Sequence, residues 1–313
     1  MFSALLTLWL NVISLGLKIF PLYINILFGF LAGKKLGVAR ETIAPLIVYI
    51  LAPVVVFTAT LQVDINAGVV LVPLTLFGVA VFICFAMFFA GKKIWDDRTK
   101  NLAAFSSGTG NTGYFGIPLA LMLLDQNEAN IYILSLVISF LYEYTVGFYI
   151  ISRGSYTFWQ SMIKIIKLPV IYAAIAGFIC NLMQIQFTQE FMDFLLQFRG
   201  AYAILGMMMI GMGLVGIKNV TINKKFIAVT FFAKFILWPA VVLFIVFIDS
   251  HFMHVFEQSA YRAMIVYSIV PMAANTVIMA TLFKIRPEEA SFAILLSTAL
   301  SFFTIPLMVI LFL

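Results

Sequence analysis

Residues 106–118 read SSGTGNTGYFGIP, and this stretch lies inside a hydrophobic segment. It holds four glycines and a proline, although the flanking sequences RTKNLAAF and LALMLL are typical of a helix that crosses a membrane. Glycine lowers the cost of unwinding a helix, and proline removes an amide donor and clashes with the preceding turn. The sequence therefore predicts a helix that is interrupted near its middle.

The composition indicates a protein that lies within a lipid bilayer. The 313 residues are 64% hydrophobic and only 10% charged, whereas soluble domains are about 25% charged. The apolar segments are roughly 17–24 residues long, which suits helices that cross a hydrocarbon core of about 30 Å. Barrel strands are about ten residues long and alternate in polarity. We therefore expect an all-α integral membrane protein.

The sequence offers little for catalysis or metal binding. No zinc, phosphate-loop or dinucleotide motif is present, and no nucleophile–base constellation appears. His251 and His254 are two ligands at most, and we expect them in a solvated loop. Cys84 and Cys180 fall in apolar segments, where cysteine behaves as a small hydrophobe. We expect no enzyme activity, no cofactor and no metal.

Charged and turn-forming residues divide the chain into ten expected spans. The first 17 residues are apolar but short, and Trp9 suits the headgroup zone, so we expect an interfacial helix there. The expected spans cover residues 19–33, 43–62, 68–91, 101–124, 130–152, 168–183, 195–216, 226–248, 260–283 and 289–312.

The basic residues give these spans an orientation. Fifteen of the 19 lysines and arginines fall in loops on one side, Lys234 falls inside a span, and the other side has three, which are Lys18, Arg199 and Arg262. Basic loops stay cytoplasmic. We therefore expect both termini outside. The net charge of +6 reflects this topology and contact with a lipid bilayer, not binding of nucleic acid.

Two pairs of segments indicate an internal repeat. At an offset of 148, Pro21 and Gly29 align with Pro169 and Gly177. At an offset of 161, Glu128 aligns with Glu289. A unit of five spans that occurs twice enters the membrane from opposite sides, which is typical of secondary transporters. We expect a first repeat over 1–152, a short cytoplasmic linker over 153–167 and an inverted second repeat over 168–313.

The repeat pairs the fourth span with the ninth, which contains IVPMAANTVIMA at residues 269–280. Paired interruptions are the best sequence indication of a transporter binding site. Each break exposes a helix N-terminus with free N–H groups and partial positive charge, and two of them near one point favour an anion. A simpler alternative is that glycine and proline permit tight helix packing. The expected substrate-binding residues include Asn111, Thr112, Gly113, Asn275 and Thr276, with Gly116, Pro118 and Pro271 at the crossing point.

Several segments resemble the auxin efflux carrier family, which includes plant auxin exporters and bacterial malonate and malate permeases. They are NTGYFGIPL (111–119), GMGLVGI (211–217), KFILWPAVV (234–242) and STALSFFTIPL (297–307). The resemblance implies ten helices in two inverted repeats, related to sodium/bile-acid symporters and sodium/proton antiporters. It implies a scaffold of spans 1, 2, 6 and 7 and an elevator-type transport domain of spans 3–5 and 8–10.

The resemblance also implies roles for individual residues. Asn111 matches an asparagine that meets the substrate carboxylate, and Tyr144 matches a tyrosine that lines the same site. The loop at 152–167 lacks the large insertion of the plant exporters, which favours a prokaryotic protein in the inner membrane and leaves the substrate open. A homodimer through the scaffold helices is also left open.

Two ionisable residues fall deep inside the expected spans. Glu143 and Lys234 each lie about 14 Å from the cytoplasmic end, at 1.5 Å per residue. Charges at that depth are costly and usually functional. We expect Lys234 to replace a coupling cation at the crossover and to donate to Glu143. The alternative is that each contacts water separately or that the lysine reaches the interface.

The function expected from these features is transport of small organic anions. A cation-coupled symporter or antiporter for another solute is the second candidate. A channel would not need paired breaks, and a sensor would want a soluble domain.

Overall fold

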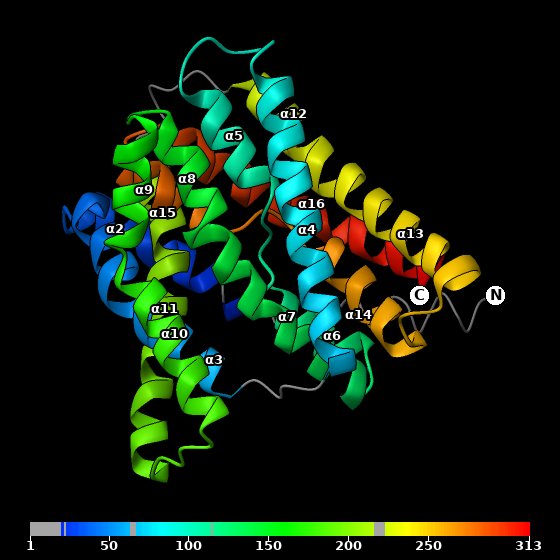
Figure 1. The fold of residues 1–313 in the computed structure, drawn as a ribbon. Coiled ribbons are helices and arrows are strands. Elements are labelled where there is room, and N and C mark those ends of the chain that lie inside the picture. Colours follow the sequence, from blue (N-terminus) through cyan, green and yellow to red (C-terminus); the bar gives the residue numbers. More distant parts are fainter. Residues whose placement is uncertain (1–19, 22, 63–66, 114, 216–222) are drawn as a thin grey trace.

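The computed structural model describes residues 20, 21, 23–62, 67–113, 115–215 and 223–313, without the side chains of 67–70 and Pro118. Within these ranges every regular element is helical (Figure 1). The interfacial helix expected over residues 1–17 lies outside them. After a helical segment at 23–35, the elements are α2 (Arg40–Leu46), η1 (Ile47–Leu51), α3 (Ala52–Leu61), α4 (Ala67–Gly91), α5 (Thr99–Ser107), α6 (Gly116–Leu123), α7 (Gln126–Tyr144), α8 (Val146–Arg153), α9 (Phe158–Ile166), α10 (Pro169–Leu182), α11 (Gln189–Leu214), α12 (Lys224–Phe232), η3 (Ala233–Leu237), α13 (Trp238–Ile248), η4 (Asp249–Met253), α14 (Gln258–Ser268), α15 (Asn275–Leu282) and α16 (Pro287–Phe312).

Several continuous helices are long and apolar enough to cross a membrane. Among the described residues there are six, or seven if the pair α9 and α10, bent by 46°, is one span. Fewer spans meet this criterion than the ten expected, for a physical reason. The fourth and ninth expected spans are each divided into two helices of eight to eleven residues. A helix needs about 20 residues to cross alone.

The two interrupted spans break where the sequence predicts. α5 ends at Ser107 and α6 starts at Gly116. α14 ends at Ser268 and α15 starts at Asn275. We call the residues between these helices, 108–113 with 115 and 269–274, the crossover. α6 and α15 both begin there, so their N-termini lie inside the protein and not at its surface.

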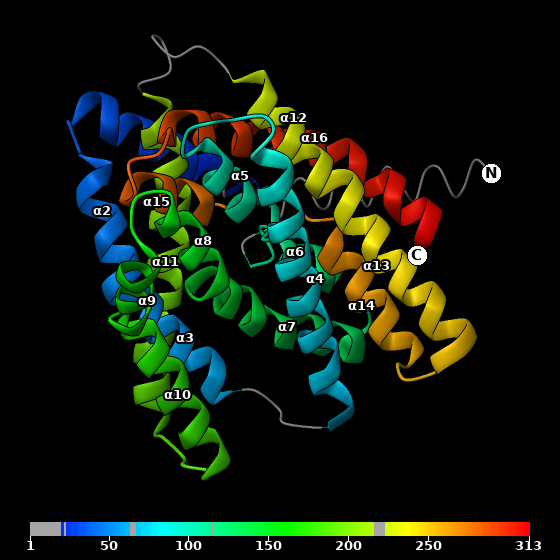
Figure 2. The same cartoon turned by 45° about the horizontal axis from the view of Figure 1, so that its top comes forward.

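The helices form two groups, as the two views show (Figures 1 and 2). The first group contains α2, α3, α10 and α11, which pack against one another. The second contains α4, α5, α7, α8, α13, α14, α15 and α16, and its α7 also contacts α3 of the first group. The two groups contact each other mainly where α11 meets α15 and α16 and where α15 meets α2.

Glycines allow the helices of the first group to approach closely. A Cβ on Gly29 would lie 2.0 Å from the carbonyl oxygen of Met208 in α11, and one on Gly211 would lie 1.9 Å from that of Ile26. A Cβ on Gly177 in α10 would lie 2.5 Å from the carbonyl oxygen of Phe57 in α3. Small residues that bring backbones together are the usual way in which helices associate in lipid.

The linker between the two expected halves contains an unexpected helix. α9 begins with a capping box in which Thr157 and Gln160 bond to each other's backbone amides. Its apolar residues are exposed, with Trp159 73% and Ile166 57% accessible. An exposed apolar face with nearby lysines, here Lys164 in the last turn and Lys167 at the end of the helix, is typical of helices that lie in the membrane interface.

Candidate functional site: a cavity at the crossed helix breaks

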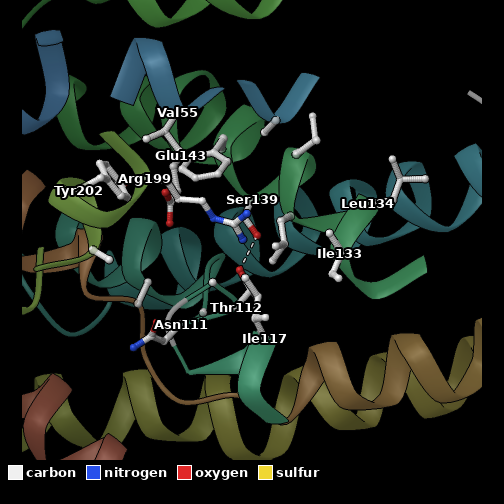
Figure 3. A pocket seen from close by; sticks show the side chains of 18 of the residues that line it. Val55, Asn111, Thr112, Ile117, Ile133, Leu134, Ser139, Glu143, Arg199 and Tyr202 are labelled. Atoms are coloured by element: carbon white, nitrogen blue, oxygen red, sulfur yellow. Dashed lines mark hydrogen bonds between the residues drawn. The ribbon is translucent and has the colours of Figure 1, made fainter. Parts of the chain in front are cut away.

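A cavity of about 680 Å³ reaches from one end of the molecule to the crossover. At its outer end it is lined by Gln62, Asn127 and Asn130, and at its inner end by residues 110–113 and 273–275. α3 and α11 form one wall and α7 forms the other (Figure 3). Its volume matches that of pockets that bind small molecules.

Backbone and side-chain bonds join the two breaks at the base of the cavity. The amide of Asn111 donates to the carbonyl of Pro271 at 2.8 Å. The amide of Met272, the next residue, donates to the hydroxyl of Ser297 in α16 at 3.2 Å. Broken backbone at membrane depth persists only when its polar groups are satisfied inside the protein or by water. These bonds satisfy part of that requirement.

α7 fixes the first break through tyrosine and serine hydroxyls. Tyr132 donates to the carbonyl of Thr112 at 2.9 Å, and the hydroxyls of Thr112 and Ser139 lie 2.9 Å apart. A Cβ on Gly116 would lie 1.8 Å from the Tyr132 hydroxyl oxygen. Only glycine therefore fits at the first residue of α6 with Tyr132 in this place.

Asn111 stabilises the start of α6 and leaves one polar group without a partner. Its side-chain oxygen accepts from the amide of Phe115 at 3.3 Å, and its carbonyl accepts from that of Gly116 at 2.9 Å. The Nδ2 atom is buried and has no hydrogen-bond partner among the described residues. Buried donors in this condition usually serve a ligand, an ion or a water molecule.

Glu143 is buried beside the cavity and connects both breaks. One oxygen accepts from the Thr109 hydroxyl at 2.7 Å, and the other accepts from Nδ2 of Asn275. The oxygen of Asn275 in turn accepts from the Tyr202 hydroxyl at 2.9 Å. The carboxylate is 2% exposed. Its described partners are neutral, so the carboxyl group is held in place by hydrogen bonds and not by an ion pair.

Lys234 lies at the crossover, as expected, but not against Glu143. Its Nζ atom is 2.7 Å from the point where a Cβ on Gly110 would lie, and it sits 4.7 Å from the ring centre of Trp238. The structure has no ion pair between Lys234 and Glu143, both of which it describes. The expected donation to Glu143 is therefore wrong in this conformation, in which the two carboxylate oxygens accept hydrogen bonds from Thr109 and Asn275 instead.

The expected site residues divide into two sets. Asn111, Thr112, Gly113 and Asn275 line the cavity. Tyr144 is buried in the core and Thr276 is buried in α15, and neither lines the cavity. Pro271 and Gly116 lie at the crossover as expected. The side chain of Pro118 is outside the described residues.

Sequence reasoning missed a cation in the cavity wall. Arg199 was counted with the charges of the outer side and falls near the start of the expected span 195–216. In the structure α11 begins ten residues before it, at Gln189, and Arg199 lines the cavity from this helix. Figure 3 shows the Arg199 side chain extended across the cavity toward Ser139 and Thr112.

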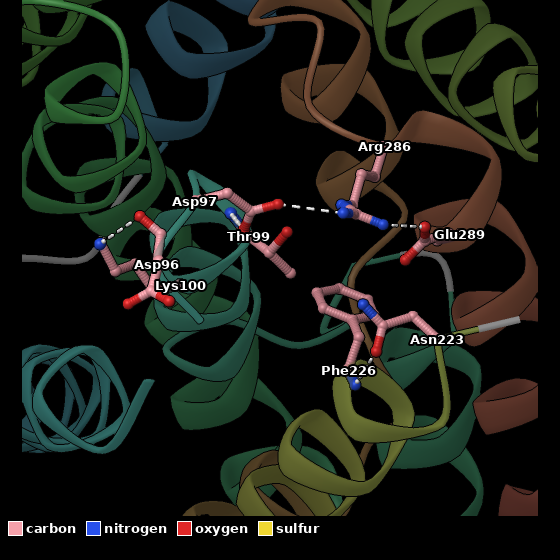
Figure 4. Close-up of polar contacts among 8 residues, drawn as sticks. All are labelled: Asp96, Asp97, Thr99, Lys100, Asn223, Phe226, Arg286 and Glu289. Carbon is pink, nitrogen blue, oxygen red and sulfur yellow. Dashed lines mark hydrogen bonds and ion pairs between the residues drawn. The ribbon is translucent and has the colours of Figure 1, made fainter. Parts of the chain in front are cut away.

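Ion pairs join the helices at the opposite end of the molecule, which we call the basic end because it carries Lys92, Lys93, Lys224, Lys225 and Arg286. Arg40 of α2 pairs with Glu288 of α16. Arg286 contacts Asp97 at 3.0 Å and Glu289 at 2.6 Å (Figure 4). Burial alone would raise the pKa of the Asp97 carboxyl, but hydrogen bonds from Thr99 and the Arg286 guanidinium outweigh it and hold this pKa below its usual range.

A multi-pass helical protein with crossed breaks beside a solute-sized cavity has the architecture of a membrane transporter. The chain matches the model of the family described as membrane transport protein over residues 16–158 and 156–309. It belongs to this family, which includes the auxin efflux carriers, and its members are transporters and not enzymes. A search of curated proteins gives no match.

Proposed function

We propose that the protein is a secondary carrier of small organic anions, such as malonate, malate or auxin-like acids. The observation that carries this proposal is the cavity whose inner end meets the first turns of α6 and α15. Helix N-termini direct N–H groups and partial positive charge at a bound anion. The unpartnered Nδ2 of Asn111 adds a donor at the same place.

The inverted repeat and the elevator motion are further parts of the proposal. Gly29 packs the helix at 23–35 on α11, and its repeat partner Gly177 packs α10 on α3. The two glycines thus make the same type of contact in each half. The group with α3, α10 and α11 would be the scaffold, and the group with α4, α5, α7 and α14 would carry the site.

Orientation follows from charge. Gln126 and Gln258 would face the outside, and the basic end would face the cytoplasm. In that orientation the cavity opens outward, and the Arg40–Glu288 pair lies on the closed cytoplasmic side.

A coupled carrier for another solute is the second candidate, and Glu143 favours it. A buried carboxylate at the crossover is suited to carry a proton or to attract a cation. The test is uptake of labelled malonate and malate into liposomes, with and without a pH gradient. Uptake above protein-free liposomes supports the anion carrier. Transport of neither acid under any gradient would reject it.

A further inference from the structure

Arg199 is a cationic residue of a candidate span, and it has no carboxylate partner among the described residues. α11, at Gln189–Leu214, is apolar enough to cross the membrane, and Arg199 is its eleventh residue. Charged residues within such helices usually face a water-filled cavity and serve transport, and Arg199 is exposed where it lines the cavity. The structure pairs Arg40, Arg262 and Arg286 with carboxylates, but it contains no ion pair of Arg199 within the described residues.

Arg199 does not form an ion pair with the carboxylate that lines the same cavity. Glu143 is the one acidic residue among the described residues that line it, and both of its oxygens are held by Thr109 and Asn275. Apart from Glu143 and Arg199, the described side chains that line the cavity are apolar or neutral. An anion that enters this cavity therefore meets one free guanidinium.

The position of Arg199 allows a bound anion to be contacted from both walls of the cavity. Arg199 and Tyr202 belong to α11, whereas Thr112 and Ser139 belong to the opposite wall. Figure 3 shows the guanidinium reaching between these walls. A planar guanidinium binds a carboxylate through two parallel N–H···O bonds, which an ammonium cannot reproduce.

We propose that Arg199 binds the carboxylate of the substrate directly and gives the carrier its preference for anions. This inference rests on the proposed function. The bound carboxylate would lie between Arg199 on one wall and the hydroxyls of Thr112 and Ser139 on the other. Because it contacts both helix groups, it would also favour the conformation in which they face each other in this way.

The first test is kinetic and uses labelled malonate uptake into liposomes. Arg199→Gln should raise the KM for malonate about 10- to 100-fold, the range expected for a lost charge-assisted bond. Arg199→Lys should lie between this variant and the wild type. The double variant R199Q/Q197R keeps the net charge but moves the guanidinium about 200° around α11, and it should be as defective as R199Q.

The outcomes separate the two proposals. If the wild type takes up no carboxylate, the anion-carrier function fails, and this inference fails with it. If the wild type transports malonate and R199Q keeps the same KM, the carrier function stands and this inference is overturned. Full activity of the double variant would show that net charge is enough, which would also overturn it.

Chemical rescue remains informative if Arg199→Gln is poorly folded. Arg199→Cys is made together with Cys180→Ser, since Cys84 is buried. The thiol is then treated with methanethiosulfonates that attach an ammonium, a sulfonate or a methyl group. Only the ammonium should restore malonate uptake and lower its KM. Equal recovery with the neutral or anionic reagent would overturn direct binding.

Discussion

The backbone amide of Asn111 donates a 2.8 Å hydrogen bond to the carbonyl of Pro271. The two residues belong to different interrupted spans, so this bond is the point at which the breaks touch. It leaves the side chain of Asn111 with an oxygen bound to Phe115 and a nitrogen without a partner. The side chain therefore has one atom that stabilises the start of α6 and one atom for which we propose the substrate as partner.

This division predicts different effects for two substitutions of Asn111. Asn111→Asp keeps the oxygen that caps α6 but replaces the free donor with negative charge. We expect a folded protein whose affinity for malonate falls by more than that of Asn111→Ala, which should lose about 1–3 kcal/mol of binding. Binding is measured by calorimetry in detergent. Gln197→Glu adds the same charge on α11 away from the cavity lining and should bind normally. Normal affinity in all three variants contradicts the site.

Glu143 should be important for both stability and coupling. Glu143→Ala leaves the Thr109 hydroxyl and the Asn275 amide without an acceptor, at a cost of about 1–3 kcal/mol for each buried group. Its Tm should fall clearly below that of the wild type. Glu143→Gln keeps the shape but cannot release a proton, so its uptake should no longer respond to a pH gradient. A gradient response equal to that of the wild type would exclude Glu143 as the proton site.

Lys234 places a positive charge at the crossover, which leads us to expect transport without sodium. Lys234→Ala should abolish transport and lower Tm, because it removes the buried stem and a cation–π contact with Trp238 that is worth about 0.5–2 kcal/mol. Wild-type uptake should be the same in sodium buffer and in choline buffer. A strict sodium requirement refutes the replacement of sodium by lysine, whatever the variant does.

The ion pairs at the basic end should weaken in acid. The pKa of Asp97 is lower in the folded protein than its ordinary value of 3.8. The pair therefore stabilises the fold above that value, and the stabilisation is lost as pH falls through the lower, folded pKa. Asp97→Asn should have a lower Tm than the wild type at pH 6, and the difference should shrink below about pH 4. A difference that is independent of pH contradicts the assignment. Asp96→Asn is the matched control, because the carboxylate of Asp96, unlike that of its neighbour Asp97, is not in an ion pair with Arg286.

The orientation has a direct test with single cysteines. Thiols at Gln126 and Gln258, both exposed, should react in intact cells with a reagent that does not cross membranes. A thiol at Lys93, which is also exposed, should react only after the cells are opened. The reverse pattern would invert the topology derived from the basic loops.

The sequence predicts where the helices are interrupted, but it does not predict which side chains of different helices contact one another. Gly108–Pro118 and Pro271–Thr276 predicted both breaks, because glycine and proline act locally on the backbone. The family resemblance is likewise confirmed by the family match. A role for Arg199 was not predicted, because which side chains of a helix line a cavity depends on how the helices pack against one another. The partners of Glu143 are Thr109 and Asn275, and a choice between these and Lys234 depends on long-range packing that periodicity does not encode.

The two oxygens of Glu143 are bound on different sides of the crossover, because Thr109 lies in the first break and Asn275 begins α15 directly after the second. This carboxylate of α7 therefore links the two interrupted spans to each other. Separating the breaks would leave buried polar groups unpaired, which costs more than sliding apolar helix faces past one another. If α7 and the two interrupted spans move as one unit, the barrier to ions lies where this unit contacts the surrounding helices. Substitutions of Glu143 that weaken this link should therefore cause an ion leak before they slow the transport cycle.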